Sequence, residues 1–136
     1  MEMQTLVGTQ EGLHELGDSG GVSLAGHEIA ALARDGSTWW AIVDRKELWR
    51  SESGDEWAHI ASAETLALNC VLATPASLFV GTSEANLLKL RGETLEGVGP
   101  FDSIEGRKEW HTPWGGPPDV RSLSSDGSSA IYANVH

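Results

Sequence analysis

Two segments of this chain carry nearly the same short phrase. Residues 5–10 read TLVGTQ and residues 77–83 read SLFVGTS. The apolar stretches 38–44 (TWWAIVD) and 130–136 (AIYANVH) join the same series when Val7, Ile42, Val80 and Tyr132 are treated as equivalent. The steps are then 35, 38 and 52 residues, and the first two suit a four-stranded repeat of about 40 residues. The longer third step accommodates an insert at residues 101–119.

A second apolar stretch precedes each of the last three copies. These stretches cover residues 28–37, 66–77 and 120–129, and the turn dipeptides Asp35-Gly36, Thr74-Pro75 and Asp126-Gly127 separate them from the copies. Two apolar runs around a tight turn are typical of a β-hairpin. Residues 28–36 also have apolar spacing that suits two helical turns, but the repeat favours a strand there. A further strand follows quickly after each of the first three copies, as in GLHELG, KELWRSES and ANLLKL.

Short antiparallel sheets repeated along a chain indicate a solenoid-like stack or a β-propeller. We predict an all-β fold of about three four-stranded antiparallel propeller blades, which is a half-propeller. The expected blades cover residues 4–27, 28–65 and 66–119, and an incomplete last blade covers 120–136.

The charge balance argues against some classes of partner. Nine Lys and Arg face twenty Asp and Glu, and the net charge of −11 disfavours binding to nucleic acid or to anionic lipid. Solubility is the simpler explanation of the same acidity, and we prefer it. The single cysteine, Cys70, excludes an internal disulfide and a cysteine metal site. With no signal-like N-terminus and no apolar run near the roughly 20 residues that span a bilayer, we expect a cytoplasmic protein with no membrane partner.

Several segments resemble one known family. Residues 120–136, VRSLSSDGSSAIYANVH, resemble the inner hairpin of BNR/sialidase-like β-propellers, whose repeats are of the WD40/YVTN/BNR-like kind. Residues 48–57, LWRSESGDEW, are similar to the Asp-box Ser-x-Asp-x-Gly-x-x-Trp, with Ser51, Gly54 and Trp57 matching in kind. The central Asp is missing, Ser53 lies nearby, and the segment is one residue short. Residues 109–127 resemble the insert of bacterial glycosyl hydrolase BNR repeat proteins, but propellers of this kind host many functions.

The resemblance also implies a partner. Members of the family are usually more than twice as long, with six or more blades, so this chain corresponds to the N-terminal half. The repeat supplies three outer strands, two full blades and two inner strands. Three blades cannot close a ring, and an open half leaves sheet edges free to pair with another chain. We expect a second copy to close a six-blade ring as a two-fold homodimer, or a separate C-terminal half to do so.

The insert and the channel mouth hold the candidate ligand-binding residues. In the insert, Trp110, His111 and Trp114 lie among prolines and glycines, and they either bind a ligand such as a sugar ring or cap the end of the blade. Near the inner strands, a polar ring at the channel mouth either binds an anion or a metal or is satisfied by water. The residues expected in this ring are His27 and Glu28, Asp119 and Arg121, and Asn134 and His136.

No catalytic residue, metal site or cofactor is assigned. Histidines 27, 111 and 136 are suitable ligand types, but their spacing matches no metal motif. Sialidase chemistry needs a tyrosine nucleophile, an acid and an arginine cluster, yet the single tyrosine, Tyr132, is expected to face the core. We predict a non-enzymatic binding or scaffold module. The alternative is a sialidase-like glycoside hydrolase with a composite site, in which Asp119, Arg121 and His136 gather with acidic residues of a partner chain.

Overall fold

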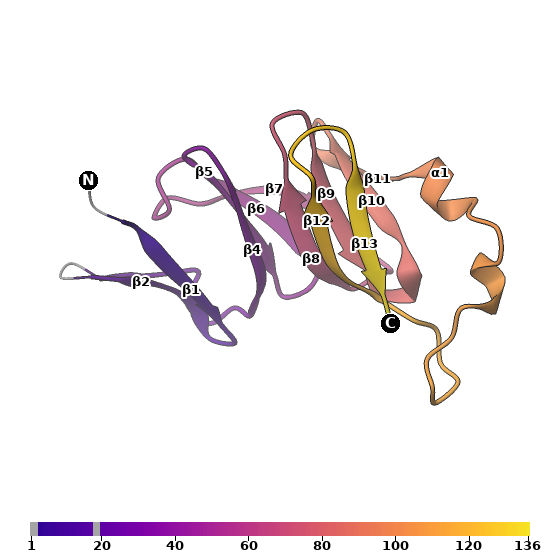
Figure 1. The fold of residues 1–136 in the computed structure, drawn as a ribbon. Coiled ribbons are helices and arrows are strands. Elements are labelled where there is room, and N and C mark those ends of the chain that lie inside the picture. Colours follow the sequence, from indigo (N-terminus) through magenta and orange to yellow (C-terminus); the bar gives the residue numbers. More distant parts are fainter. Residues whose placement is uncertain (1–2, 18–19) are drawn as a thin grey trace.

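The computed structural model describes residues 3–17 and 20–136, and their thirteen strands form four antiparallel sheets (Figure 1). The first sheet holds β1 (Thr5–Thr9), β2 (Gly12–Leu16) and β3 (Val22–Ser23). The second holds β4 (Ile29–Asp35), β5 (Thr38–Val43), β6 (Glu47–Ser51) and β7 (Ala58–Ser62). The third holds β8 (Leu68–Ala73), β9 (Leu78–Thr82), β10 (Leu87–Arg91) and β11 (Thr94–Gly97). The fourth holds β12 (Val120–Ser125) and β13 (Ile131–Val135).

Each strand pairs with its neighbour in sequence, so every sheet is a meander. The predicted all-β fold of four-stranded antiparallel sheets is confirmed, and the segment with helical spacing is strand β4. Among residues 3–17 and 20–136, helix is limited to α1 (Gly99–Asp102) and the 3-10 turns Ser83–Ala85 and Arg107–Glu109. In the described part of the chain, no helix has the length and apolarity to cross a membrane.

The first strands of the last three sheets all begin with the same irregularity. The register of β4, β8 and β12 skips one residue against the second strand, so Ala30, Asn69 and Arg121 have no partner across the pair. Such bulges bend a strand locally and re-aim its side chains. The repetition of the bulge shows that the three sheets are copies of one unit, with β4, β8 and β12 lying next to one another.

The bulge fixes which residues of the second strands are equivalent. Backbone amides of Asp44, Ser83 and His136 close the three hairpin ends on the carbonyls of Glu28, Ala67 and Asp119. The equivalent sets are Leu6, Trp40, Phe79 and Tyr132, then Val7, Ala41, Val80 and Ala133, then Gly8, Ile42, Gly81 and Asn134. The equivalence of Val7 and Val80 is therefore confirmed. The placing of Ile42 and Tyr132 in that set was wrong by one residue each, in opposite directions.

The glycine of the repeated phrase allows neighbouring sheets to approach closely. A Cβ on Gly8 would lie 2.7 Å from Ile29 Cγ2, and one on Gly81 would lie 2.5 Å from Val120 Cγ1. Ile29 and Val120 open the first strand of the next sheet, and both are buried. Glycine in a strand interior often marks such a close approach. The second sheet carries Ile42 at this position, fully buried against Leu68 of the third sheet.

The apolar core lies between the sheets. One cluster joins the first and second sheets through Leu13, Ile29, Ala41 and Val43. The other joins the second and third sheets, and its buried members are Ile42, Leu48, Ala61, Leu68, Leu78 and Val80. Burial of apolar surface contributes roughly 25 cal/mol per Å² to the free energy of folding. Because both clusters lie between sheets, each sheet is stabilised mainly by packing on its neighbours.

The turn that resembles an Asp-box is built on two serines. Ser51 is buried, and its Oγ accepts hydrogen bonds from the amides of Ser53 (3.2 Å) and Gly54 (2.7 Å). Ser53 Oγ accepts in turn from the amide of Glu56 at 3.3 Å, and Trp57 Nε1 donates to the Gly54 carbonyl at 3.2 Å. The turn therefore closes with serine in place of the missing Asp.

Candidate functional site

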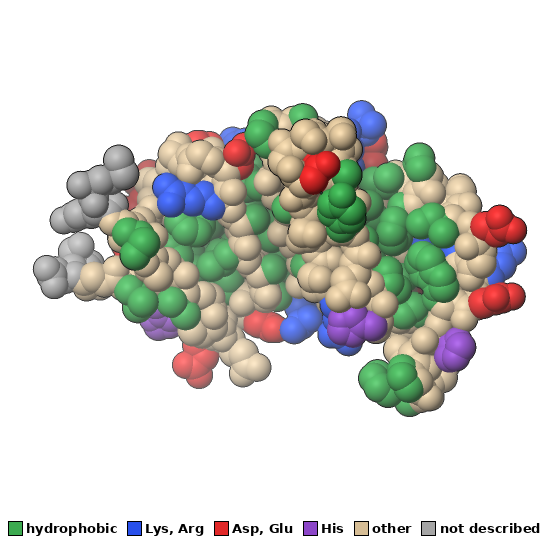
Figure 2. All heavy atoms as spheres, viewed as in Figure 1, with side chains coloured by type: hydrophobic (Ala, Val, Ile, Leu, Met, Phe, Trp, Pro, Cys, Tyr) green, Lys and Arg blue, Asp and Glu red, His purple; other side chains and the backbone are tan. Residues whose placement is uncertain are grey.

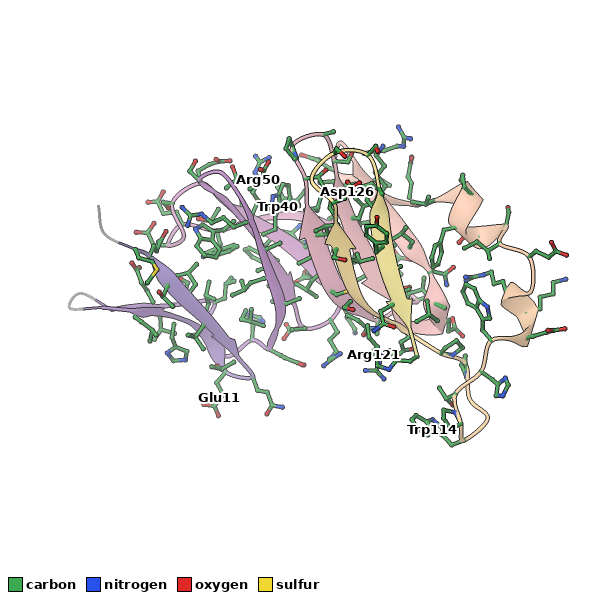
Figure 3. The ribbon with its side chains drawn as sticks, in the orientation of Figure 1. Glu11, Trp40, Arg50, Trp114, Arg121 and Asp126 are labelled. Carbon is green, nitrogen blue, oxygen red and sulfur yellow. The ribbon has the colours of Figure 1, made fainter. Side chains whose placement is uncertain are left out.

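A row of polar side chains lies at the end where β4, β8 and β12 begin. We call it the strand-start row, and it consists of His27, Glu28, Asp44, Arg45, Asn69, Asp119 and Arg121. Figure 2 shows acidic, basic and histidine side chains along this lower edge, and Figure 3 places Arg121 there, opposite Asp126 at the hairpin end. Two members of the row, Asn69 and Arg121, are the bulge residues of β8 and β12.

His27 pairs with the carboxylate of Asp44, which lies in the turn directly after β5. Its Nδ1 lies 2.7 Å from Asp44 Oδ2, and Asp44 Oδ1 accepts the Glu28 amide at 2.9 Å. The hydrogen bond with His27 is the largest effect and lowers the pKa of Asp44 below its ordinary value. Desolvation opposes this effect, and the hydrogen bond from the Glu28 amide adds a smaller lowering of the pKa. Asp44 is thus a carboxylate at neutral pH, and His27 is held by it.

The row continues from the second sheet to the fourth. Arg45 Nε lies 3.1 Å from Glu28 Oε1, and its Nη1 donates to Asn69 Oδ1 at 3.4 Å. Asn69 Nδ2 in turn donates to the Val120 carbonyl at 3.4 Å. A polar chain of contacts therefore links the starts of three successive first strands.

Asp119 and Arg121 form the last part of the row. Arg121 Nη2 lies 3.2 Å from Asp119 Oδ2, while Asp119 Oδ1 accepts the Glu84 amide at 3.3 Å. The backbones of Asp119 and His136 exchange two hydrogen bonds of 3.0 and 3.1 Å. Asn134 lies apart from the row, because it has the place of Gly81, where a Cβ faces the following sheet.

The insert holds Trp110 firmly. Trp110 packs edge-on to Phe101 with ring centroids 6.2 Å apart, and the Arg107 guanidinium lies 5.4 and 5.3 Å from the two rings. Arg107 Nη2 also donates to Asn86 Oδ1 and to the Glu84 carbonyl, both at 3.4 Å. Trp110 is therefore a packed residue that fixes the insert on the connection between β9 and β10.

Trp114, unlike Trp110, is exposed to solvent. It is 81% exposed at the tip of a tight turn, as Figure 3 shows. Thr112 closes this turn, because its Oγ1 accepts the Gly116 amide at 3.0 Å and its carbonyl accepts the Gly115 amide at 2.9 Å. The loop presents an aromatic face to solvent on a short, closed base.

A hollow of about 240 Å³ brings together three of the residues that the sequence singled out. Trp110, His111 and His136 line it, together with Thr112, Pro113, Pro118 and Val135. His111 Nδ1 lies 2.8 Å from the Glu109 carbonyl, which sets the orientation of the ring. A second hollow of about 680 Å³ lies between residues 102–110 of the insert and the Glu84–Ala85 turn.

The other expected groupings do not form. His27 lies at the start of the second sheet and is bound to Asp44, away from the hollow that His111 and His136 share. Within residues 3–17 and 20–136, no group of three or more His, Cys, Asp or Glu side chains is placed to hold a metal ion. The expectation that Tyr132 faces the core was wrong, since the side chain is 58% exposed on β13.

Three residues of the row escaped the sequence analysis. Asn69 lies inside the apolar run that forms β8, where a single polar residue was the only signal of the bulge. Asp44 and Arg45 both have positive φ, 54° and 55°, which is uncommon outside glycine. Three charged residues directly after an apolar run, Asp44-Arg45-Lys46, were the available signal of that turn.

Two sheets in the described chain are incomplete, and both leave a strand edge open. β1 is equivalent to a second strand, but the first sheet has no strand on the inner side of it. β13 is also a second strand, and nothing pairs with it on the outer side. The first sheet also has no sheet packed on its other face within the described chain, and Val7, which faces away from the second sheet, is 39% exposed. The equivalent Val80 is fully buried in the cluster between the second and third sheets.

No family model matches this chain, and comparison with curated proteins finds no match. Among solved structures, YCF48 bound to a D1 peptide superposes with a TM-score of 0.59 at 15% sequence identity. The match covers 96% of this chain and 50% of the YCF48 chain, so the present chain spans half the length of that neighbour. The likeness shows a β-propeller fold, as the stacked four-stranded sheets do.

Proposed function

We propose that this chain is a non-enzymatic binding and scaffold module of the β-propeller type, whose ring is closed by a complementary half-propeller. The observation that carries the proposal is the pair of incomplete sheets with open edges at β1 and β13. An open edge offers a row of unpaired backbone groups to another strand. The half-length match to YCF48 supports the idea of a missing half of similar size.

The numbers of strands in the two incomplete sheets favour one kind of closing partner over the other. The first sheet has three strands and lacks one inside β1, and the fourth has two strands and lacks two outside β13. If a second copy paired its first sheet with this fourth sheet, each seam would hold five strands. A separate C-terminal half that contributes one strand at one seam and two at the other would give four-stranded sheets throughout. We therefore favour the separate half over the homodimeric six-blade ring.

The ligand surface of the closed ring is proposed at the strand-start row and the adjoining hollow. The first strands line the centre of a propeller, so the row would lie at the mouth of the channel. The hollow lined by Trp110, His111 and His136 would adjoin it, with Trp114 free beside it. The YCF48 structure contains a peptide, and this supports a peptide as ligand. A reducing compartment such as the cytoplasm suits the half-buried, unpaired Cys70.

No observation favours the glycoside hydrolase alternative in the same way. Tyr132, the single tyrosine, lies on the open strand β13, and Arg121 is engaged by Asp119. Tyr132 would have to be the nucleophile and Arg121 the arginine that binds a substrate carboxylate, but none of the described contacts joins these two residues.

Mass in solution combined with amide hydrogen exchange tests the proposal. We expect a 14.5 kDa monomer at micromolar concentration, by light scattering, whose outward amides on β13 exchange freely. A monomer with those amides as protected as the amides of β9 would contradict the proposal, since the edge would then be closed within the chain. A doubled mass with protected amides would overturn the separate half in favour of a second copy.

A further inference from the structure

The third strands of the two complete sheets share one pattern. β6 carries Leu48-Trp49-Arg50, and β10 carries Leu87-Leu88-Lys89. In both strands the basic residue pairs across the sheet with an aromatic residue of the second strand, Arg50 with Trp40 and Lys89 with Phe79. The Arg50 guanidinium lies 5.7 Å from the Trp40 ring, and the Lys89 ammonium lies 5.9 Å from the Phe79 ring. Both distances suit a cation–π contact.

The leucine of the pattern is part of the core. Leu48 pairs with Ile42 and Leu87 with Gly81, and both leucines are buried. The first sheet keeps this leucine, because Leu13 pairs with Gly8 and is 1% exposed. The first three sheets therefore share one feature. Each has a buried leucine on its third strand, opposite the residue of the second strand that faces the next sheet.

The first sheet provides an internal control for the basic residue. The position equivalent to Trp40 and Phe79 is there Leu6, which has no aromatic ring, and its partner across the sheet is Glu15. The cation therefore occurs where the second strand offers an aromatic ring, and an acid occurs where it does not. Cross-strand pairs of this kind are the unit by which sheets are stabilised.

β13 carries the equivalents of the aromatic position and of the glycine position, but no third strand of the described chain pairs with them. Tyr132 stands at the place of Trp40 and Phe79, and Asn134 stands at the place of Ile42 and Gly81. The strand lies at the open edge of its sheet (Figure 1). The Tyr132 side chain is largely exposed. In the second and third sheets, the third strands β6 and β10 pair with the equivalent strand and bring a basic residue to its aromatic ring.

We infer that the strand completing this sheet is a basic one of the form Leu-x-Lys or Leu-x-Arg. It runs antiparallel to β13, with its leucine opposite Asn134 and its cation over the ring of Tyr132. The inference rests on the proposed closure of the ring and specifies the chemistry of one seam. A second copy fits poorly, because the strand that it leaves open is β1, Thr5–Thr9, which carries no Lys or Arg, while its β2 already pairs with β1 and β3. A basic strand also complements a chain with a net charge of −11.

The chain itself supplies a probe for this test. His136 has the position of Ser83, so a copy of residues 84–97 placed directly after His136 carries β10 and β11 with their natural connection. We compare the full chain extended by this copy with one whose copy carries Lys89→Glu. Both extended chains are also made with Tyr132→Leu, and Tyr132→Phe serves as the matched control that keeps the ring. Hydrogen exchange of the outward β13 amides and thermal denaturation are the readouts.

With Tyr132 or Phe at this position, we expect the lysine extension to slow exchange of the outward β13 amides about fivefold more than the glutamate extension. With Tyr132→Leu the difference should vanish or reverse, since in the first sheet the equivalent Leu6 has the acidic Glu15 as its partner across the pair. Equal protection by both extensions on Tyr132 would overturn the basic strand and leave ring closure standing. If neither extension protects β13, completion of this edge by a third strand is itself refuted.

Discussion

Gly8 and Gly81 set how closely neighbouring sheets approach. Each lies on a second strand, at the point where the first residue of the next sheet, Ile29 or Val120, fills the space of a Cβ. The repeated Val-Gly-Thr phrase is therefore a packing requirement between sheets. The second sheet has Ile42 in place of this glycine, and the isoleucine side chain is buried. The same position is therefore filled either by a side chain of the next sheet or by its own side chain.

Gly81→Ala should loosen the packing of the fourth sheet on the third. The new Cβ would lie 2.5 Å from Val120 Cγ1 and 2.6 Å from Cys70 Sγ, and neither neighbour is a flexible chain end. Overpacking of this kind costs about 1–3 kcal/mol in the free energy of unfolding, measurable by urea denaturation. Gly99→Ala is the control, because nothing lies within 4 Å of its Cβ position. Equal stability of the two variants would refute the close-packing role.

His27→Ala should raise the pKa of Asp44 toward its ordinary value near 3.8, because the hydrogen bond from His27 is the largest cause of the depression. A lowered pKa contributes stability that is present above the unfolded value and is lost as pH falls through the folded value. The variant should therefore lose less stability between about pH 4 and pH 2 than the parent. Carboxyl chemical shifts of Asp44 followed against pH measure this, with His59→Ala as control. An unchanged titration of Asp44 in His27→Ala would contradict the assignment.

At residue scale, the sequence predicted the equivalence of Val7 and Val80 because the glycine marks it. It misplaced Ile42 and Tyr132, since their strands lack that glycine and apolar runs alone do not define register. The bulge at Asn69 stayed hidden, because one extra residue in a strand leaves no pattern in an apolar segment. Tyr132 lies on the open edge strand of a sheet that no further sheet of the described chain covers, so no local pattern could indicate its exposure.

The hairpins are the elements that the sequence predicted best. Asp35-Gly36 and Asp126-Gly127 lie in the β4–β5 and β12–β13 turns, as the turn dipeptides indicated. Gly36 and Gly127 have φ of 61° and 84°, which glycine adopts without strain. The insert was harder to predict, because the anchoring of Trp110 by Arg107 joins it to a distant connection between two strands.

Asp126→Ala should open the turn of the β12–β13 hairpin. Asp126 Oδ1 accepts the amides of Ser128, Ser129 and Ala130 at 2.8, 3.0 and 3.1 Å, and these bonds lower its pKa. Because the carboxylate form makes these bonds, their contribution is present at neutral pH and is lost as pH falls through the depressed pKa. Faster exchange of the three amides at neutral pH would be the expected result.

Ser129→Ala is the matched control for this turn, since it removes a hydroxyl and keeps the amide that Asp126 binds. In the parent chain, the same three amides should also lose protection under acid, well below pH 3.8, while the β4–β5 turn is unaffected. Equal exchange rates in the parent chain and in Asp126→Ala would show that the backbone closes the turn alone.

At the scale of the whole molecule, the fold is a row of sheets that stabilise one another. The first and second sheets share one core cluster and the second and third share the other, and Val120 is buried where the fourth sheet meets the third. The order of the sheets could be predicted from the repeat, because each unit follows the last along the chain. What pairs with β1 and β13 could not be predicted in the same way, since no residue of the described chain occupies those edges.

This arrangement predicts an order of local opening. The buried residues Ile42, Leu48, Leu68 and Val80 all lie in the second and third sheets, which have complete strand sets and neighbours on both sides. Stability in a stacked array is the sum of each unit and its interfaces, so a sheet with few strands and one neighbour opens first. Amides of β5, β6 and β9 should therefore exchange slowest, and those of β1–β3 and β12–β13 fastest.

Native-state hydrogen exchange resolved by strand measures this order. Gly81→Ala should then speed exchange in β12 and β13 and leave β5 and β6 close to the parent rates, because the added methyl group acts at the last interface only. If all four sheets exchanged at one rate in both proteins, the array would open as a single cooperative unit. The incomplete sheets would then be as stable as the complete ones, and their open edges would no longer support the proposal of a closing partner.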